Sequence, residues 1–282
     1  MCNTCGCSIT PGNRPLVLAE KPRDGVSTVT VLKNLSSKND RQAEHNRAHF
    51  DRHGVLVVNL MSSPGSGKTA LLEATIKRLA GSLKIAVIEG DLETENDARR
   101  IQALGVTAFQ ITTGTACHLD AHLVHNALHQ MDLTNLDVLF IENVGNLVCP
   151  ASFDLGHHRN VILLSVTEGD DKPAKYPVMF RAADLMLISK TDLLPYLDDF
   201  SPNRAQQSLR NLASKAPVLE LSAHQPQNLD VWINWLHDAL KTHRRQLANH
   251  QTQRPAIARD DVLLHGEASL RLRPVMPEST RP

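Results

Sequence analysis

Val55-Leu-Val-Val-Asn-Leu-Met61 runs directly into Ser62-Ser-Pro-Gly-Ser-Gly-Lys-Thr69. The first stretch is a short apolar run, which is typical of a strand buried within a parallel sheet. The second is a glycine-containing loop, and residues 71–79 after it place apolar side chains on one face of a helix. Strand, loop and helix in this order predict a phosphate-binding loop, because backbone N–H groups at a helix N-terminus surround phosphate oxygens.

Each residue type in this loop has an expected task. Lys68 reaches the β- and γ-phosphates of a nucleotide, and the Thr69 hydroxyl ligates Mg²⁺. Ser62 stands where the usual P-loop has its first glycine, and the alternative is a loop that only turns the strand into the helix. The predicted nucleotide contacts in this stretch are Gly65, Ser66, Gly67, Lys68, Thr69 and Ala70.

Further apolar runs alternate with helical patterns along the chain. One of these patterns, over residues 229–240, repeats apolar side chains at helical spacing. Strands that alternate with helices predict an α/β fold with a doubly wound, mostly parallel sheet. The remaining candidate strands are Lys84–Glu89, Val106–Ile111, Val138–Ile141, Val161–Val166, Leu185–Ser189 and the shorter Val218–Leu221.

Three regions are expected. Residues 1–37 hold three cysteines and three prolines, which predicts an N-terminal metal-binding motif on a flexible linker. Residues 38–244 form the P-loop domain, which opens with a polar, helix-compatible stretch ending at His53. Residues 245–282, with Gln, Arg and Pro and no sustained period, are expected to be a disordered tail.

Composition excludes several classes of protein. The chain has 282 residues, 30 of them basic and 30 acidic, so its formal net charge is zero and it carries no electrostatic footprint for nucleic acid or an anionic membrane. No run approaches the ~20 apolar residues of a membrane span, and the start lacks the pattern of a signal peptide. We therefore expect a cytoplasmic protein, whose odd number of cysteines, five, stays reduced.

A second nucleotide motif is expected at Ser189-Lys-Thr-Asp192. The Asp192 carboxylate can accept hydrogen bonds from guanine N1–H and the exocyclic amine, and the Lys190 stem can cover the base. Adenine lacks this pair of donors, so the aspartate selects guanine. Ser222 and Ala223 are a further candidate base contact. A purely structural loop is the alternative for the Ser-Lys-Thr-Asp motif, whose familiar form begins with Asn.

Carboxylates at the ends of predicted strands suit the catalytic part of such a site. Glu142 is placed to hold Mg²⁺ through water, and the Gly145 N–H to sense the γ-phosphate. Asp91 is the candidate for orienting the attacking water, and helix capping by Asp91 or Thr94 is the alternative. Lys68, Asp91 and Glu142 are thus the predicted catalytic residues.

All five cysteines fall into two clusters. Cys2, Cys5 and Cys7 offer three thiolates in one short loop, and soft sulfur ligands favour Zn²⁺, Cu(I) or Ni²⁺ over Mg²⁺. The fourth ligand is not in the motif, and half of a structural zinc site is the alternative. Cys149 lies shortly after Gly145, so a movement at the γ-phosphate would reach it.

The second cluster consists of Cys117, His118 and Cys149, with Cys117-His118 expected to open a helix. We predict a metal site, and buried thiols beside a core histidine are the alternative. Other histidines recur at helical spacing and are interpreted as solvated helix faces. They are His122, His125 and His129 in one stretch, and His45, His49 and His53 in another.

Together these motifs resemble the HypB family, the GTP-dependent nickel-incorporation proteins of nickel–iron hydrogenase maturation. The resemblance covers about residues 1–7 and 50–240. It implies that Cys2, Cys5 and Cys7 bind nickel tightly. It also implies a second site, for nickel or zinc, at a dimer interface, which maps onto Cys117, His118 and Cys149.

The same resemblance implies partners and a reaction. It implies hydrolysis of GTP to GDP and phosphate, dimerisation on GTP binding, a HypA-type nickel and zinc accessory protein, and the hydrogenase large subunit as recipient. The rivals are a sister GTPase that serves urease or a cobalamin enzyme, a metal-sequestering protein with a vestigial nucleotide site, and a small-molecule kinase. No arginine-rich lid segment supports the kinase.

Overall fold

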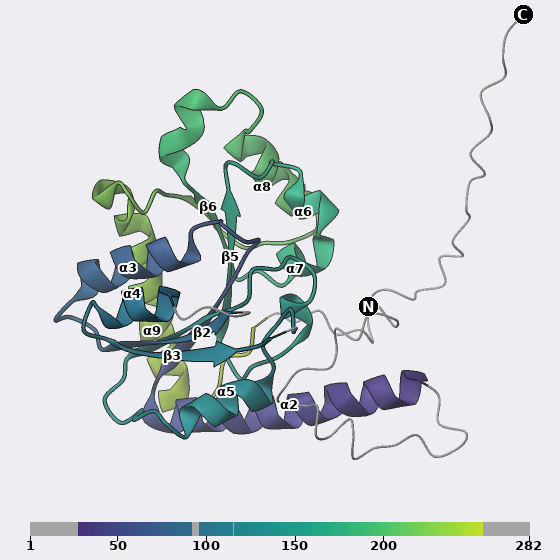
Figure 1. Cartoon of the computed structure of the whole chain (residues 1–282), viewed down its shortest axis with the longest axis vertical. Helices are drawn as coiled ribbons and strands as arrows, with labels where there is room; N and C mark the ends of the chain where they lie inside the picture. Colours follow the sequence, from purple (N-terminus) through teal and green to yellow (C-terminus); the bar gives the residue numbers. More distant parts are fainter. Residues whose placement is uncertain (1–27, 92–95, 115, 256–282) are drawn as a thin grey trace, which may run out of the picture.

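Seven parallel strands form one sheet, in the order β3-β2-β4-β1-β5-β6-β7. This confirms the predicted doubly wound α/β fold, and the pairing is parallel throughout the part of the chain that the structure describes (Figure 1). The strands are β1 (Leu56–Met61), β2 (Ile85–Asp91), β3 (Thr107–Thr112), β4 (Val138–Glu142), β5 (Arg159–Ser165), β6 (Leu185–Ser189) and β7 (Val218–Glu220).

This computed structural model describes residues 28–91, 96–114 and 116–255. The predicted metal ligands Cys2, Cys5 and Cys7 lie outside the described residues, as do residues 256–282. The helices are α2 (Thr28–His53), α3 (Lys68–Leu79), α4 (Asn96–Gln102), α5 (Ala121–Leu128), α6 (Lys172–Lys175), α7 (Pro177–Arg181), α8 (Pro202–Asn211) and α9 (Asp230–Ala248), and the short 3-10 turns are η1 (Pro150–Ser152), η2 (Thr191–Tyr196) and η3 (Pro226–Asn228).

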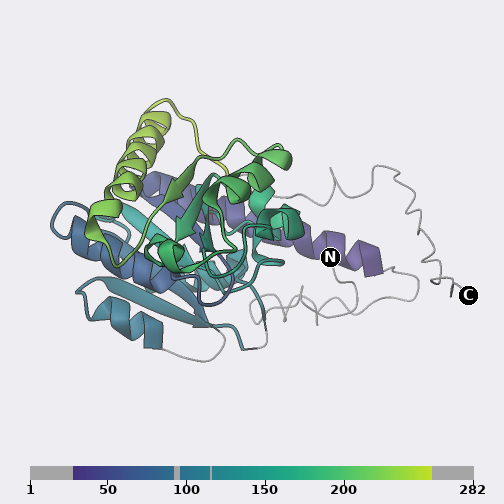
Figure 2. The ribbon, with the colours of Figure 1, turned by 90° about the horizontal axis from the view of Figure 1, so that it is seen from above.

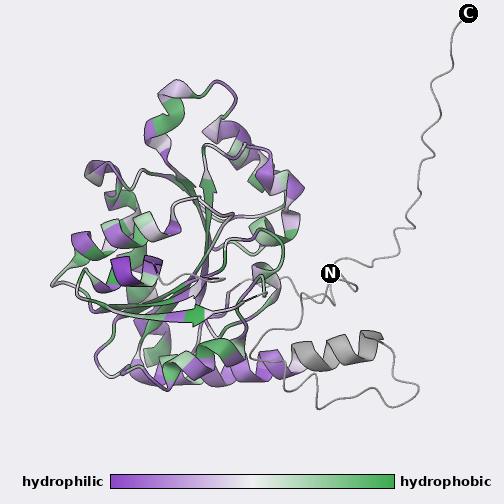
Figure 3. Cartoon of the chain, viewed as in Figure 1, coloured by the Kyte–Doolittle hydropathy of each residue, from purple (hydrophilic) through white to green (hydrophobic). Residues whose placement is uncertain are grey.

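Helices cover both faces of the sheet (Figures 1 and 2). On one face, α3, α4 and α9 pack against alternate strand residues such as Leu56, Val58 and Leu60 of β1. On the other face, α2 and α5 cover one half of the sheet and α7 and α8 the other half. The strands are apolar and the outer sides of the helices are polar (Figure 3). Burial from both faces explains why the strands read as continuous apolar runs.

The ends of the described domain differ from the prediction. Helix α2 begins at Thr28, inside the segment predicted as a linker, and α9 continues to Ala248, beyond the predicted boundary at 244. Past α9, Arg254 donates a hydrogen bond of 2.8 Å to Glu44 on α2, so residues 245–255 pack on the domain instead of belonging to a disordered tail. Among the described residues, no helix is long and apolar enough to cross a membrane.

Strand β1 lies at the point where the order of the sheet reverses. The chain leaves β1 for β2 on one side, and β4 is followed by β5 on the other side of β1. At such a switch point the loops at the carboxyl ends of the strands separate and leave room for a ligand. The loop after β1 is the P-loop, so the topology places it there.

A network of histidines lies at the opposite edge of the sheet. The Val57 N–H donates to His158 Nδ1 at 2.9 Å, so Nε2 carries the proton and donates to Asp51 Oδ1 at 3.1 Å. His243 lies 4.0 Å from the same carboxylate. Because both nitrogens of His158 are engaged, it has no lone pair for a metal, and the group acts as a hydrogen-bonded link between α2 and β5.

The buried histidines at this edge make the free energy of unfolding depend on pH. Burial lowers the pKa of His157 and of His158 to about 4, from 6.5 in the unfolded chain. Between these values the unfolded chain binds more protons, so the free energy of unfolding is fully present above pH 6.5 and falls as the pH drops toward 4. Each of the two histidines lowers the free energy of unfolding by at most about 3 kcal/mol over this range. Urea unfolding followed by tryptophan fluorescence at pH 7, 6 and 5 measures it.

The His158→Gln variant should show a shallower dependence of unfolding free energy on pH, because it lacks one of the titrating rings. The exposed His237 on α9 supplies the matched control, His237→Gln, which should keep the wild-type slope. A His158→Gln slope equal to that of the wild type would contradict this explanation.

Candidate nucleotide and metal site

The P-loop takes its shape from two glycines. Gly65 has φ 74° and Gly67 has φ 95°, in the left-handed region that other residues adopt at a cost. Gly67 is the N-cap of α3, so the loop ends directly at the N-terminus of this helix. This is the geometry that surrounds phosphate oxygens with N–H groups.

Ser62, the departure from the usual pattern, has a structural partner. It is fully buried, and the Lys68 Nζ donates to its hydroxyl oxygen at 2.9 Å. Burial lowers the pKa of Lys68, and the carboxylates of Glu142 and Glu168 act in the opposite direction. Ser62 therefore holds the lysine across the loop in the position from which it reaches phosphate.

Carboxylates surround the Thr69 hydroxyl. It lies 2.9 Å from Glu142 Oε1 and 3.1 Å from Asp97 Oδ2. Burial raises the pKa of Glu142 to about 7, and burial together with Glu142 and Asp97 raises the pKa of Glu89 to about 8. The second oxygen of each glutamate, Oε2, is buried with no hydrogen-bond partner among the described residues. Hydroxyl and carboxylate oxygens with free lone pairs fit the ligand set of Mg²⁺.

Three acidic residues of the site, Glu89 on β2 among them, were missed by the sequence prediction. Asp97 lies on α4, and Glu168 follows β5 and accepts hydrogen bonds from the hydroxyls of Ser63 and Ser66. For Glu168 the signal was present, since it is a carboxylate just beyond a buried strand.

Asp91 ends β2 and is half-buried, while Thr94 lies outside the described residues. The water-orienting role of Asp91 stays a prediction.

The predicted base-recognition loop contacts the P-loop directly. Lys190, with φ 60°, donates from Nζ to the Gly65 carbonyl at 2.6 Å. Asp192 is the residue of interest, because its Oδ1 is buried without a hydrogen-bond partner among the described residues. A buried acceptor left open at a loop edge fits a ligand that supplies N–H donors.

The loop after β7 lies beside this one. The Thr191 N–H donates to the Leu221 carbonyl at 3.3 Å, so the two loops are joined by backbone. Ser222 is buried, and its hydroxyl accepts from the His224 N–H at 3.1 Å, while Ala223 is half-exposed. The structure thus brings the predicted Ser222 and Ala223 contacts to the same edge as Asp192.

The second cysteine cluster is assembled by the fold. Cys117 Sγ lies 3.3 Å from Cys149 Sγ and 3.7 Å from His118 Nδ1, and the three ligand atoms are within 4.8 Å of one another. His118 is fully buried and stacks on Phe153 with ring centroids 3.9 Å apart. Burial lowers the pKa of His118 to about 4, so the ring is neutral. Two thiols and a neutral imidazole suit Ni²⁺ or Zn²⁺.

The position of this cluster differs from the prediction in one respect. Cys117 and His118 do not open a helix, because α5 starts at Ala121 with Asp120 as its N-cap. The Asp120 carboxylate accepts from the Leu123 N–H at 2.8 Å. The pair therefore lies in the bend before the helix, where the side chains can turn toward Cys149.

One segment, residues 142–149, connects the nucleotide and metal residues. It begins at Glu142, beside Thr69, and ends at Cys149. Between them, the Asn143 Oδ1 accepts from the Leu119 N–H at 3.3 Å, and the Asn146 Nδ2 donates to the Cys117 carbonyl at 3.1 Å. Hydrogen bonds from this segment therefore reach the backbone of both Cys117 and Leu119, on either side of His118.

Comparison with known proteins agrees with this arrangement. The family described as "CobW/HypB/UreG, nucleotide-binding domain" matches residues 56–220. The "Hydrogenase maturation factor HypB" of Azotobacter vinelandii is 52% identical over 206 residues, covering 73% of this chain and 68% of that protein. The chain belongs to the HypB family. Its Escherichia coli relative of the same name is 53% identical over 199 residues, covering 71% of this chain and 68% of the relative.

Solved structures of the HypB family share the fold. The crystal structure of HypB from Helicobacter pylori in complex with nickel is 41% identical, has a TM-score of 0.71, and covers 77% of this chain and 99% of its own. HypB from Archaeoglobus fulgidus is 38% identical with a TM-score of 0.67, covering 72% and 99%. These comparisons confirm the resemblance that the motifs indicated.

Gly145 provides a test of the P-loop contact. A Cβ on Gly145 would lie 2.9 Å from Pro64 Cα and 3.0 Å from Pro64 N, both backbone atoms. Overpacking of this kind costs about 1–3 kcal/mol, so Gly145→Ala should weaken nucleotide binding by roughly 10- to 100-fold. Calorimetric titration with GDP measures the affinity.

Gly105→Ala is the control, since a Cβ there meets nothing within 4 Å and the residue is remote from the P-loop. Its positive φ of 80°, which Gly145 does not share, adds backbone strain away from the P-loop, so this variant shows whether general destabilisation alone lowers the GDP affinity. Equal GDP affinity in the Gly145→Ala variant and the wild type would show that the Pro64 contact does not shape the nucleotide site.

Proposed function

We propose that this HypB-family chain is a GTP-hydrolysing nickel metallochaperone that delivers nickel during maturation of the nickel–iron hydrogenase large subunit. The single observation that carries the proposal is the connection of Thr69 and Glu142 to Cys117 and Cys149 through residues 142–149. The names of the relatives, hydrogenase maturation factors, and a nickel-containing homologous structure support the same function.

In the proposed reaction, GTP is hydrolysed to GDP and phosphate by water. Lys68 and the P-loop backbone hold the phosphates, and Asp91 orients the water. Thr69 and Glu142 would hold Mg²⁺, which would supply positive charge to the phosphate oxygens. The buried Lys68 excludes water from its side of the phosphates and keeps a fixed position through Ser62. Asp192, with Lys190 across the base and the Ser222–Ala223 loop beside it, selects guanine.

Nickel is the cargo. We assign tight binding to Cys2, Cys5 and Cys7, and a second, nucleotide-coupled site to Cys117, His118 and Cys149, which can also hold zinc. In the second site one chain supplies three ligands from the described residues. An ion with three protein ligands keeps a position open for an incoming ligand. The two thiols are half-exposed, so a recipient can reach the metal.

Nucleotide and metal affinities are coupled in this proposal. GTP orders the loops at Asp91 and Glu142, promotes a homodimer, and moves Cys149 relative to Cys117 and His118. Because the coupling is a free energy shared by both sites, metal must change GTP affinity by the same factor as GTP changes metal affinity. The proposed partners are a HypA-type nickel and zinc accessory protein and the hydrogenase large subunit precursor, in the cytoplasm.

Urease is a second candidate recipient. The relative from Helicobacter pylori, 42% identical over 225 residues, is named a hydrogenase/urease maturation factor. Deletion of this chain's gene, with hydrogenase and urease activities measured separately, distinguishes the two recipients.

Nickel affinity in different nucleotide states tests the proposal. In the full chain with Cys2, Cys5 and Cys7 replaced by Ser, sulfur-to-nickel charge-transfer absorption during competition with a chelator reports the inner thiolate site alone. Affinity should differ between GDP and a non-hydrolysable GTP analogue, by about 5- to 150-fold if the coupling is of ordinary size. Asn146→Ala should reduce this difference, because it removes the hydrogen bond to Cys117.

Asn135→Ala is the matched control, an exposed asparagine outside the connecting segment. Identical nickel affinities with both nucleotides would overturn the gating. Lys68→Ala tests the rival metal-sequestering protein: if nickel delivery to hydrogenase survives this substitution, the nucleotide site is vestigial and the rival holds.

Asp192→Asn tests base recognition. The asparagine amide can accept from N1–H but meets the guanine amine with its own N–H₂ group, so GTP affinity should fall by about 10- to 100-fold, equivalent to about 1–3 kcal/mol. Xanthine carries an oxygen in place of that amine, so XTP should bind the variant better than GTP does. Unchanged GTP preference in a nucleotide-competition titration would show that Asp192 does not contact the base.

A further inference from the structure

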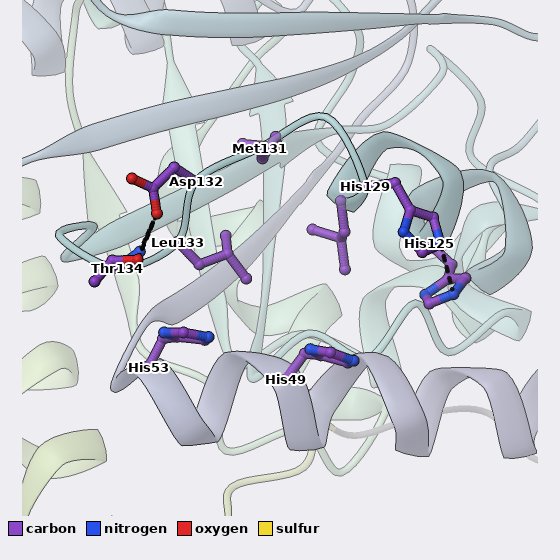
Figure 4. Close-up of a pocket in the computed structure, with 9 residues that line it drawn as sticks. His49, His53, His125, His129, Met131, Asp132, Leu133 and Thr134 are labelled. Atoms are coloured by element: carbon purple, nitrogen blue, oxygen red, sulfur yellow. Dashed lines mark hydrogen bonds between the residues drawn. The ribbon is translucent and has the colours of Figure 1, made fainter.

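The two histidine stripes face each other. His45, His49 and His53 lie on α2, and His125 and His129 lie on α5 and at its C-cap. Figure 4 shows His49, His53, His125 and His129 around one open pocket between the two helices, with Asp132 at its far end. The interpretation of both stripes as separate solvated faces is therefore incomplete, because the fold joins them.

Two of the imidazoles, those of His125 and His129, are close enough to bind one ion, and His45 and His49 lie beside them. His125 Nε2 and His129 Nε2 are 3.2 Å apart. The ring centroids of His45 lie 4.7 Å from those of His49 and 5.1 Å from those of His125. Two nitrogens bound to one tetrahedral ion at about 2.0–2.1 Å are about 3.3 Å apart, so the His125–His129 spacing fits a single ion.

Asn46 fixes which nitrogen of His125 is available. Its Nδ2 donates to the carbonyls of Ala121, at 2.8 Å, and Leu155, at 3.1 Å, so its Oδ1 must be the atom that faces His125 Nδ1 at 3.1 Å. An amide oxygen only accepts, and His125 Nδ1 therefore carries the proton. Nε2 of the neutral ring keeps its lone pair, directed at His129 (Figure 4).

This arrangement is held by buried contacts between the helices. Asn46 is fully buried, and the Asn39 Oδ1 on α2 accepts from the Ala121 N–H at the start of α5 at 2.9 Å. Gly156 packs so closely on α2 that a Cβ there would lie 2.6 Å from Asn46 Cβ. A second partner that orients a histidine in this way is typical of metal ligands. Burial and the neighbouring His129 and His45 lower the pKa of His125, which favours the neutral ring.

We propose that His125 and His129 form a binding site for a divalent transition metal, Ni²⁺ or Zn²⁺, beside His45 and His49 of α2, whose ring centroids lie 5.1 Å and 6.4 Å from that of His125. Neutral imidazoles suit both ions and do not suit Mg²⁺. The site contains no thiol, and it lies at the far end of α5 from Cys117 and His118. It is a site additional to the cysteine clusters and does not require the proposed nucleotide gating.

The test counts metal equivalents in the full chain. Ni²⁺ alone is titrated against a chromophoric chelator, and absorption from sulfur-to-nickel charge transfer reports the thiolate sites separately. A parallel titration with Zn²⁺ alone gives the total number of equivalents. The wild type should bind one equivalent that gives no charge-transfer absorption. In His125→Gln/His129→Gln this equivalent should weaken by about 100-fold or more, since loss of even an outer partner of a ligand costs about 10- to 100-fold.

His224→Gln/His237→Gln is the matched control, because it removes two exposed histidines outside the pocket and should keep the equivalent. The single variant His129→Gln changes an exposed ring only, and should weaken the same equivalent without affecting folding. Equal metal content in the wild type and in both His129 variants would overturn the proposal. Absence of sulfur-to-nickel charge-transfer absorption in the wild type would instead contradict the proposed cysteine sites, so the two failures are distinguishable.

Discussion

The buried central strand β1 is the constraint on which the rest of the structure depends. Its parallel pairing with β4 on one side and β5 on the other brings three carboxyl ends to one edge. The P-loop leaves from the middle strand, so Glu142 and Glu168 flank it from its two neighbours. The strand order therefore determines which side chains lie beside the P-loop.

This edge contains polar groups that the protein alone leaves unsatisfied. Glu89, Glu142 and Asp192 each have a buried oxygen without a partner among the described residues. Burying such groups costs free energy unless something pairs with them. Their placement at one switch point supports the proposed ligands, a cation beside the glutamates and N–H donors at Asp192. The domain is therefore expected to be more stable with nucleotide and cation bound than without them.

The sequence predicted what local pattern determines. Seven apolar runs and the P-loop were recognisable because buried strands and phosphate loops each have a short-range signature. The start of α2 at Thr28 was missed because the prolines before it predicted a linker, while two features depended on packing, namely the entry to α5 after His118 and the partnership of Asp97 with Thr69. The facing histidines escaped for the same reason, since each stripe alone is an ordinary polar helix face and only the contact of α2 with α5 joins them.

Helix α5 lies between the two proposed metal sites, which differ in what orients their ligands. Before its first turn, Cys117 is hydrogen-bonded through its carbonyl to Asn146, on the segment that begins at the phosphate site. At its other end, His125 is oriented by Asn46, which is buried on α2 and bonded to main-chain carbonyls. In the proposed mechanism, a shift of residues 142–149 acts on the thiolates and leaves the imidazoles in place. The proposed imidazole site has no soft sulfur ligand, so we expect an ion there to exchange more readily than one held by Cys117 and Cys149. On these proposals, nucleotide control belongs to the sulfur-containing site, and the imidazole site responds to the free metal concentration alone.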